Sequence, residues 1–166
     1  MSNSNAFVFS ALLLVFSGSL FADPFLNASC KYHIDKDLII SIAAKESSLK
    51  TMAKNVNSDD SIDVCMMQIN LKEWLPKLPN ISREQIEEDV YLCVEIGAWV
   101  LAQNFESHGR QWLSIGAYKA GFASRLSETR EAYIEDIKMI YRNVQDGFYD
   151  KRLTQLGVNR TNTQCL

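Results

Sequence analysis

The sequence predicts a mainly α-helical protein built as a single domain. Its 166 residues are enough for one domain with a substantial core. A hydrophobic content of 47% and a charged content of 22% are ordinary for a globular protein. Glycine (7 residues) and proline (3 residues) are scarce, whereas an all-β protein needs many turn residues. Helices therefore account best for this composition.

The overall charge excludes several classes of partner. A net charge of −3 offers no electrostatic footprint for nucleic acid. A weakly acidic protein is also not attracted to anionic surfaces by long-range fields. We therefore predict no nucleic-acid partner, and an acidic substrate has to be recognised through local contacts.

The first 22 residues predict an export signal. They contain no Lys, Arg, Asp or Glu, and their apolar run, residues 6–16, is shorter than the roughly 20 residues that cross a bilayer. Such a run followed by small residues is typical of a secretory signal, here with cleavage after Ala22. Residues 1–22 are interpreted as a signal peptide and the mature protein as periplasmic, without a stable membrane span. A membrane anchor or a buried first helix is the alternative, because the segment has no basic residue and Leu20 lies near the cut.

Export changes how the four cysteines are interpreted. Cys30, Cys65, Cys93 and Cys165 form an even set, which in an oxidising compartment indicates two disulfides. Sequence alone does not choose among the three pairings. Our working hypothesis is Cys30–Cys93 with Cys65–Cys165, because the first bond would tie the N-terminal helix to the central one. No two cysteines have CxxC spacing and the two histidines lie far apart, so we expect no metal site.

Two helices are predicted at the start of the mature chain. Asp23 followed by Pro24 is typical of a helix start, and this helix is expected to reach about residue 31. Asp35 is suited to cap a second helix. The apolar residues of that second helix recur at helical spacing and share one stripe with Glu46.

A polar loop and a long helical region are predicted next. Residues 50–63 are interpreted as a loop that can hold a small hairpin near residues 55–65. Ser82 and Gln85 have the spacing of a capping box. Apolar residues then recur at helical spacing over 86–105 and predict one or two helices that end near the following glycine.

The C-terminal part is predicted to hold two more helices. Residues 111–122 suggest a short helix with a turn at Gly121. An amphipathic helix is expected over 131–144, and its inner face carries Tyr133, Ile137, Ile140 and Tyr141. Residues from 146 onward give little signal apart from Cys165.

Glu46 is the residue most suggestive of chemistry. A carboxyl group placed among apolar side chains loses solvation, and its pKa rises. Such a group can stay protonated near neutral pH and act as the acid in glycoside cleavage. The alternative is a glutamate that points to water at a fraying helix end, and helical spacing alone supports both interpretations.

Three strings resemble the motifs of the lytic transglycosylase family. "IAAKESS" (42–48), "CMMQIN" (65–70) and "GAYKAG" (116–121) follow in that order, where the family has "ES", "GLMQI" and "AYNAG". "IGAWVLAQNF" (96–105) also resembles the family's "GAxYLA" helix. The resemblance covers roughly residues 30–145 and is closest to small secreted members that accompany secretion, pilus and conjugation machines.

The resemblance implies a lysozyme-like domain with a sugar-binding cleft, over residues 23–145, and a tail, residues 146–166, tethered through Cys165. It implies cleavage of the β-1,4 bond between N-acetylmuramic acid and N-acetylglucosamine in peptidoglycan strands, with a 1,6-anhydro product. Components of an envelope-spanning secretion, pilus or conjugation machine would be its partners.

The same resemblance assigns roles to particular residues. Glu46 matches the catalytic acid, and Tyr118 matches the tyrosine that orients the acid or the substrate. Met67 and Gln68 match the pair that lines the cleft, whereas Met66 is expected in the core. Ser47 matches the serine that follows the acid and is assigned to substrate binding.

In the reaction that the resemblance implies, one carboxylate is enough, because the 6-hydroxyl of the bound sugar replaces an enzymic nucleophile. We therefore expect no metal and no cofactor. Asp63 lies just before the cleft motif, and its charge would raise the pKa of Glu46 further. The alternative for Asp63 is an ordinary loop aspartate.

Two departures from the family motifs keep other functions open. Cys65 replaces a glycine, and Lys119 replaces an asparagine that can bind sugar or backbone. A hydrolase of goose-type lysozyme character is one alternative, with Asp63 activating water. A non-catalytic wall-binding module that retains the fold is the other.

Overall fold

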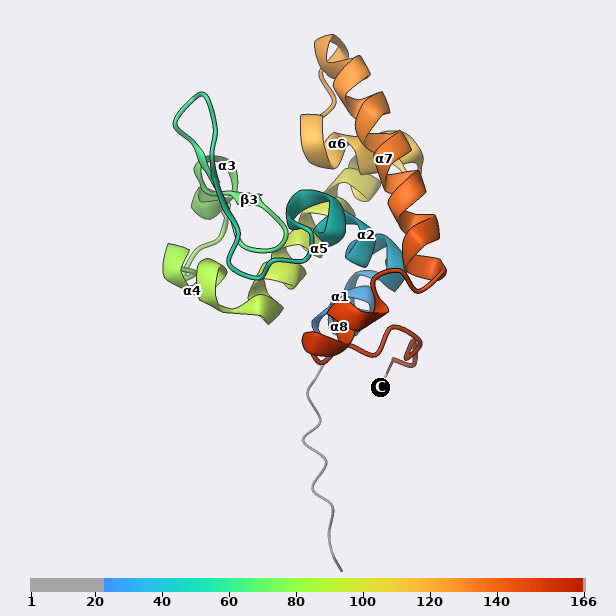
Figure 1. The fold of residues 1–166 in the computed structure, drawn as a ribbon. Coiled ribbons are helices and arrows are strands. Elements are labelled where there is room, and N and C mark those ends of the chain that lie inside the picture. Colours follow the sequence, from blue (N-terminus) through green and yellow to red (C-terminus); the bar gives the residue numbers. More distant parts are fainter. Residues whose placement is uncertain (1–22, 166) are drawn as a thin grey trace, which may run out of the picture.

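The computed structural model describes residues 23–165 (Figure 1). The predicted signal peptide lies outside the described residues. Within residues 23–165, no helix combines the length and the apolar character that a membrane crossing requires. The described chain is mainly helical with one small sheet, as the sequence predicts.

The first two helices begin at the predicted caps. Helix α1, Pro24–Tyr32, begins after Asp23, whose carboxylate accepts hydrogen bonds from the backbone N–H groups of the first turn. Helix α2, Lys36–Ser47, begins after Asp35, which accepts a bond from the N–H of Leu38 at 3.0 Å. Each carboxylate satisfies N–H groups that a helix start leaves without partners.

A three-stranded antiparallel sheet follows α2, in the order β1-β2-β3. Its strands are β1 Lys54–Val56, β2 Ile62–Val64 and β3 Ile69–Asn70. On one side of β2, Asp63 pairs with Asn55 of β1. On the other side, Val64 pairs with Ile69 of β3. The predicted hairpin near residues 55–65 is confirmed, and the third strand continues directly into a short helix.

The middle of the chain holds the short elements and the central helix. They are helix α3 Leu71–Trp74, the 3-10 turn η1 Leu75–Lys77, helix α4 Arg83–Glu88 and helix α5 Val90–His108. The capping box of Ser82 and Gln85 forms at α4 as predicted. Helix α5 is buried along most of its length, which makes it the core around which α1, α2 and α6 pack.

The remaining elements follow α5 in the sequence. They are helix α6 Trp112–Ala120, the 3-10 turn η2 Ser124–Leu126, helix α7 Ser127–Gln145 and helix α8 Asp150–Gln155. Gly121 ends α6 with φ +60°, a backbone conformation that glycine adopts without cost. In Figure 1 the strands and α3 lie on one side of α2 and α5, and α6 and α7 lie on the other.

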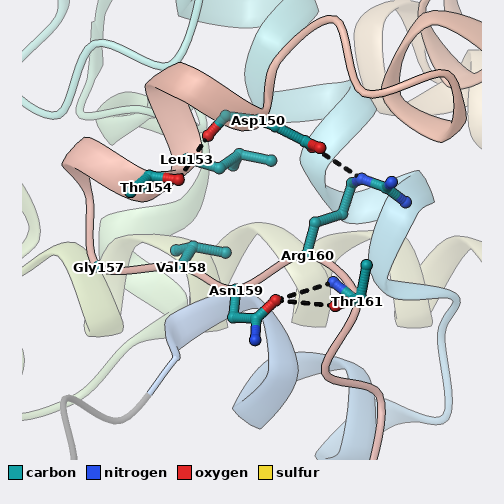
Figure 2. A pocket seen from close by; sticks show the side chains of 8 residues that line it. All are labelled: Asp150, Leu153, Thr154, Gly157, Val158, Asn159, Arg160 and Thr161. Carbon is teal, nitrogen blue, oxygen red and sulfur yellow. Dashed lines mark hydrogen bonds and ion pairs between the residues drawn. The ribbon is translucent and has the colours of Figure 1, made fainter.

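Helix α8 was not predicted, and it belongs to an ordered C-terminal segment, residues 146–165. Leu153 and Val158 of this segment are buried against the core. The segment borders a hollow of about 400 Å³, and the Arg160 side chain donates to the Asp150 carboxylate at 2.9 Å. Figure 2 shows the residues that line this hollow.

Buried Lys36 links the C-terminal segment to Asp23, the residue that caps α1. Its ammonium group lies 2.7 Å from the Asp23 carboxylate, and both side chains are almost fully buried. It also donates to the carbonyls of Asn159 at 2.7 Å and Asn162 at 2.8 Å. A buried charge with this many partners is well compensated for the solvation it loses.

The disulfide hypothesis was wrong in its pairing. The bonds are Cys30–Cys165 and Cys65–Cys93, with Cα atoms 5.7 and 6.2 Å apart. Helices α1 and α5 do pack together, but their polar link is the ion pair of Lys31 with Glu95 rather than a disulfide. Cys30 therefore remains available to bond the C-terminal segment.

Candidate active site

Glu46 lies in the last turn of α2, at the contact between α2 and α7. Its Oε1 atom accepts a hydrogen bond of 2.6 Å from the hydroxyl of Tyr133, a buried residue of α7. The carboxyl group is partly buried and borders a cavity. Helical spacing left two interpretations of Glu46 open, and the structure agrees with the one in which its side chain belongs to the buried stripe.

Burial raises the pKa of Glu46 above its ordinary value. The hydrogen bond from Tyr133 and the charge of Lys119 lower this pKa, because both favour the carboxylate. The charge of Asp63 raises it, in the direction expected, although loss of solvation is the larger cause. A carboxyl group in this environment holds its proton to a higher pH than a free glutamate, as a general acid requires.

Tyr118 is brought to the same cavity but does not bond Glu46. It lies on α6, and its hydroxyl donates to the carbonyl oxygen of Met67 at 3.0 Å. Burial, followed by the charges of Glu46 and Asp63, raises the pKa of Tyr118 well above its usual range, so the phenol stays a donor. The tyrosine that contacts the acid is Tyr133, which the sequence placed only on the inner face of the last helix.

The turn at residues 65–68 has a strained backbone. Cys65 and Gln68 have φ values of +62° and +51°, in the left-handed region that costs a side-chain-bearing residue roughly 1 kcal/mol or more. The family motif has glycine where this chain has Cys65, and the backbone of Cys65 has the positive φ that glycine adopts without cost. The disulfide from Cys65 to Cys93 of α5 holds the turn, and the Gln68 side chain donates to the Cys65 carbonyl at 3.0 Å.

Met67 was predicted to line the cleft, and its side chain does not. It is fully buried, as is Met66. A Cβ atom at Gly97 of α5 would lie only 2.5 to 2.9 Å from Met67 side-chain atoms. Met67 therefore packs into the core against Gly97, and it serves the site through its carbonyl oxygen, which Tyr118 binds.

Asp63 and Gln68 do reach the cavity. The Asp63 carboxylate is held by the side-chain amide of Asn70 at 2.7 Å, across strands β2 and β3. Ser47 borders the outer part of the cavity. Its hydroxyl donates to the carbonyl of Ala43 and accepts from the N–H of Lys50, so it is engaged by the end of α2.

The cavity is the middle of a groove made of three adjoining hollows. The central hollow, about 300 Å³, is bordered by Glu46, Asp63, Gln68, Trp74, Tyr118 and Lys119. On one side lies a lysine-lined hollow of about 560 Å³, which shares Glu46, Asp63, Gln68 and Lys119 with the central one. On the other side lies an aromatic hollow of about 430 Å³, which shares Trp74, Tyr118 and Lys119 and adds Phe122. The acid thus lies within an elongated polar groove.

Trp74 is a groove residue that sequence reasoning left unassigned. It packs edge to face against Trp99 of α5 with ring centroids 5.5 Å apart. In the sequence, Trp99 lies inside an apolar helical run, whereas Trp74 does not. The position of Trp74, directly after the cleft string and in a polar run, was the available signal.

Comparison with known proteins identifies the fold's relatives. Residues 23–141 match the Transglycosylase SLT domain. The chain belongs to the transglycosylase SLT family. Its assignment as a lytic transglycosylase with a lysozyme-like fold is thereby confirmed.

Two relatives of this SLT-family chain are similar along most of their length. Invasion protein IagB of Salmonella typhi is 30% identical over 154 residues, which cover 92% of this chain and 96% of that protein. Protein IpgF of Shigella sonnei is 34% identical over 129 residues, which cover 74% of this chain and 82% of that protein.

A solved structure shares the fold of this SLT-family chain. It is the X-ray structure of an inactive mutant of lytic transglycosylase Slt from Pseudomonas aeruginosa, with a TM-score of 0.57 and 19% identity over 79% of this chain. The matched region is 24% of that enzyme's chain, so this chain spans about a quarter of its length.

Proposed function

We propose that Glu46 is the single acid and base of a reaction that cleaves the β-1,4 bond between N-acetylmuramic acid and N-acetylglucosamine. The observation that carries this proposal is a carboxyl group with a raised pKa, bonded to the hydroxyl of Tyr133 and bordering an elongated polar groove. The peptidoglycan strand would lie along that groove.

Protonated Glu46 gives its proton to the glycosidic oxygen as the bond from that oxygen to C1 breaks. The N-acetyl group of the substrate stabilises the positive charge that develops at C1. The Glu46 carboxylate then takes the proton of the sugar's own 6-hydroxyl, and that oxygen bonds to C1. The products are a 1,6-anhydro end and a free 4-hydroxyl, and Glu46 returns to its acid form.

Neighbouring side chains adjust the pKa of Glu46, which acts as an acid in the first step and as a base in the second. Tyr133 donates a hydrogen bond to the Glu46 carboxylate, and the charge of Lys119 stabilises that carboxylate, so both limit the rise in the pKa of Glu46. The charge of Asp63 acts in the opposite direction and raises this pKa. Gln68 and Tyr118 are proposed to contact the substrate, since both border the central hollow. Ser47 is proposed to contact it at the outer rim.

The decisive experiment is digestion of purified cell-wall sacculi with wild type and Glu46→Gln. We expect 1,6-anhydro ends from wild type by mass spectrometry and none from the variant, which keeps its fold. Glu106→Gln is the matched control, because Glu106 is an exposed residue of α5. Reducing ends from wild type would favour the hydrolase alternative, with Asp63 activating water. Binding without cleavage by both proteins would favour the wall-binding alternative.

The proposed setting is the periplasm, where the enzyme would open peptidoglycan locally for an envelope-spanning secretion, pilus or conjugation machine. The name of the Salmonella relative, invasion protein IagB, supports a link to such machines. We also propose that export removes residues 1–22, leaving a catalytic domain over 23–145 and a tail over 146–166. N-terminal sequencing of the protein recovered from periplasm tests this, and any start other than Asp23 contradicts it.

A further inference from the structure

The groove carries more positive charge on one side of Glu46 than on the other. The lysine-lined hollow is bordered by Lys45, Lys50, Lys54 and Lys119. The carboxylates that border it are Glu46 and Asp63. Since Glu46 is neutral in the state that starts the reaction, Asp63 is then the one charged carboxylate among the hollow's lining residues.

Two of these lysines are already neutralised by neighbours. Lys45 forms an ion pair with Asp136 of α7. Lys54 forms one with Glu87 of α4 at 2.7 Å. Both partner carboxylates lie outside the hollow's lining, so these two lysines are directed partly away from it.

Lys50 and Lys119 are different. Both side chains are exposed, and within residues 23–165 neither ammonium group has a carboxylate within ion-pair distance. Lys119 has one evident effect in the protein itself, because its charge lowers the pKa of Glu46. Because neither Lys50 nor Lys119 has an ion-pair partner within residues 23–165, their charges are available to a ligand.

We propose that the lysine-lined hollow binds the anionic peptide that N-acetylmuramic acid carries in peptidoglycan, with Lys50 and Lys119 pairing with the peptide's carboxylates. This inference rests on the proposed function and names the form of substrate that the groove prefers. A lysine ammonium is a flexible point charge that accommodates carboxylates at varied positions, as a mobile peptide requires. The aromatic hollow on the other side, with Trp74 and Phe122, is suited to sugar faces instead.

The test compares two substrates that differ only in charge. One is soluble peptide-bearing glycan, and the other is the same glycan after its peptide carboxylates have been converted to amides. We expect wild type to cleave the native glycan faster at low substrate concentration, with about threefold of the preference supplied by each exposed lysine. Raising the salt from 0.1 M to 1 M shortens the Debye length from about 10 Å to about 3 Å and should reduce this preference.

The variants assign the preference to particular residues. Lys50→Gln with Lys119→Gln should remove it, and Lys50→Arg with Lys119→Arg should retain it. Any change in the pKa of Glu46 when Lys119 is replaced affects both substrates, so it cancels in the ratio of rates. Lys151→Gln, a change in an exposed lysine of α8, is the matched control and should leave the ratio unchanged.

Two results would overturn the inference. The first is equal cleavage of native and amidated glycan by wild type. The second is a preference that persists in the Gln double variant. In both cases anhydro ends from the amidated glycan would show that the proposed function still holds. If wild type releases anhydro ends from neither substrate, the proposed function itself fails.

Discussion

The turn at residues 65–68 and the C-terminal segment, residues 146–165, are each joined to the helices by one disulfide. The cleft disulfide, Cys65–Cys93, is buried and joins two residues that lie 28 positions apart in the sequence. The tail disulfide, Cys30–Cys165, has an exposed end and spans 135 residues. One disulfide therefore fixes a short strained turn, and the other closes a loop that contains most of the described chain.

The two regions also treat charge differently. In the C-terminal segment, buried Lys36 is paired with a carboxylate and two carbonyls. In the cleft, Glu46 is partly buried, and its bonded partner is the neutral hydroxyl of Tyr133. A well-compensated charge contributes to a single folded arrangement, whereas a poorly compensated carboxyl group keeps its proton for chemistry. The comparison separates a region built for stability from one built for reaction.

Removing the tail disulfide should have the largest effect on stability. Cys30→Ala with Cys165→Ala should lower the free energy of unfolding by up to about 5 kcal/mol in the chain-entropy account, with kcat/KM at 20 °C unchanged. Denaturant unfolding and release of anhydro ends measure the two quantities. Loss of activity while the protein is still fully folded would break the distinction between the regions.

Removing the cleft disulfide should affect both quantities. Cys65→Ala with Cys93→Ala should cost about 3.5 kcal/mol of stability for the shorter loop. We also expect at least a tenfold loss of activity, because the Met67 carbonyl that binds Tyr118 and the amide of Gln68 are both set by this turn. Activity assayed well below the unfolding midpoint isolates the second effect, and full activity there would contradict it.

Replacing Tyr133 should change the pH dependence of the reaction. Tyr133→Phe removes a donor that favours the Glu46 carboxylate, so the pKa of Glu46 rises further. The acid form then persists to higher pH, and the alkaline limb of the rate profile moves upward in pH. Tyr141→Phe, on the same helix, is the control. Initial rates between pH 5 and 9 provide the measurement, and a shift toward lower pH would contradict the assignment.

The smallest expected effect concerns the backbone of the turn alone. In a Cys93→Ala background, Cys65→Gly should be more stable than Cys65→Ala by about 1 kcal/mol, because glycine accepts a φ of +62° without cost. Thermal unfolding of the two double variants measures the difference. An alanine variant that is equally stable would mean that the turn relaxes once the disulfide is absent.

Most of the helices could be predicted from sequence because apolar spacing and capping residues are local signals. Asp23, Asp35 and the Ser82–Gln85 pair mark helix starts correctly. Helix α8 escaped prediction because it is six residues long and only Leu153 of it is buried. Its order depends on contacts with residues far away in the chain, which no local pattern records.

The site could be predicted only in part for the same reason. The motifs located Glu46, Asp63, Gln68 and Tyr118 at one cavity. They misplaced the side chain of Met67, which depends on how the turn packs against α5. They also overlooked the contact of Tyr133 with the acid, which depends on how α2 meets α7. The disulfide pairing was wrong because Cys30 and Cys165 are brought together by the fold and not by their spacing.

Gly97 determines how closely helix α5 approaches the cleft. With hydrogen alone at this position, Met67 lies where any larger residue at 97 would have to be. An alanine there would force the Met67 side chain to shift, and Met67 belongs to the turn whose Gln68 borders the groove. A change at 97 is therefore expected to act on substrate fit indirectly, through the position of this turn.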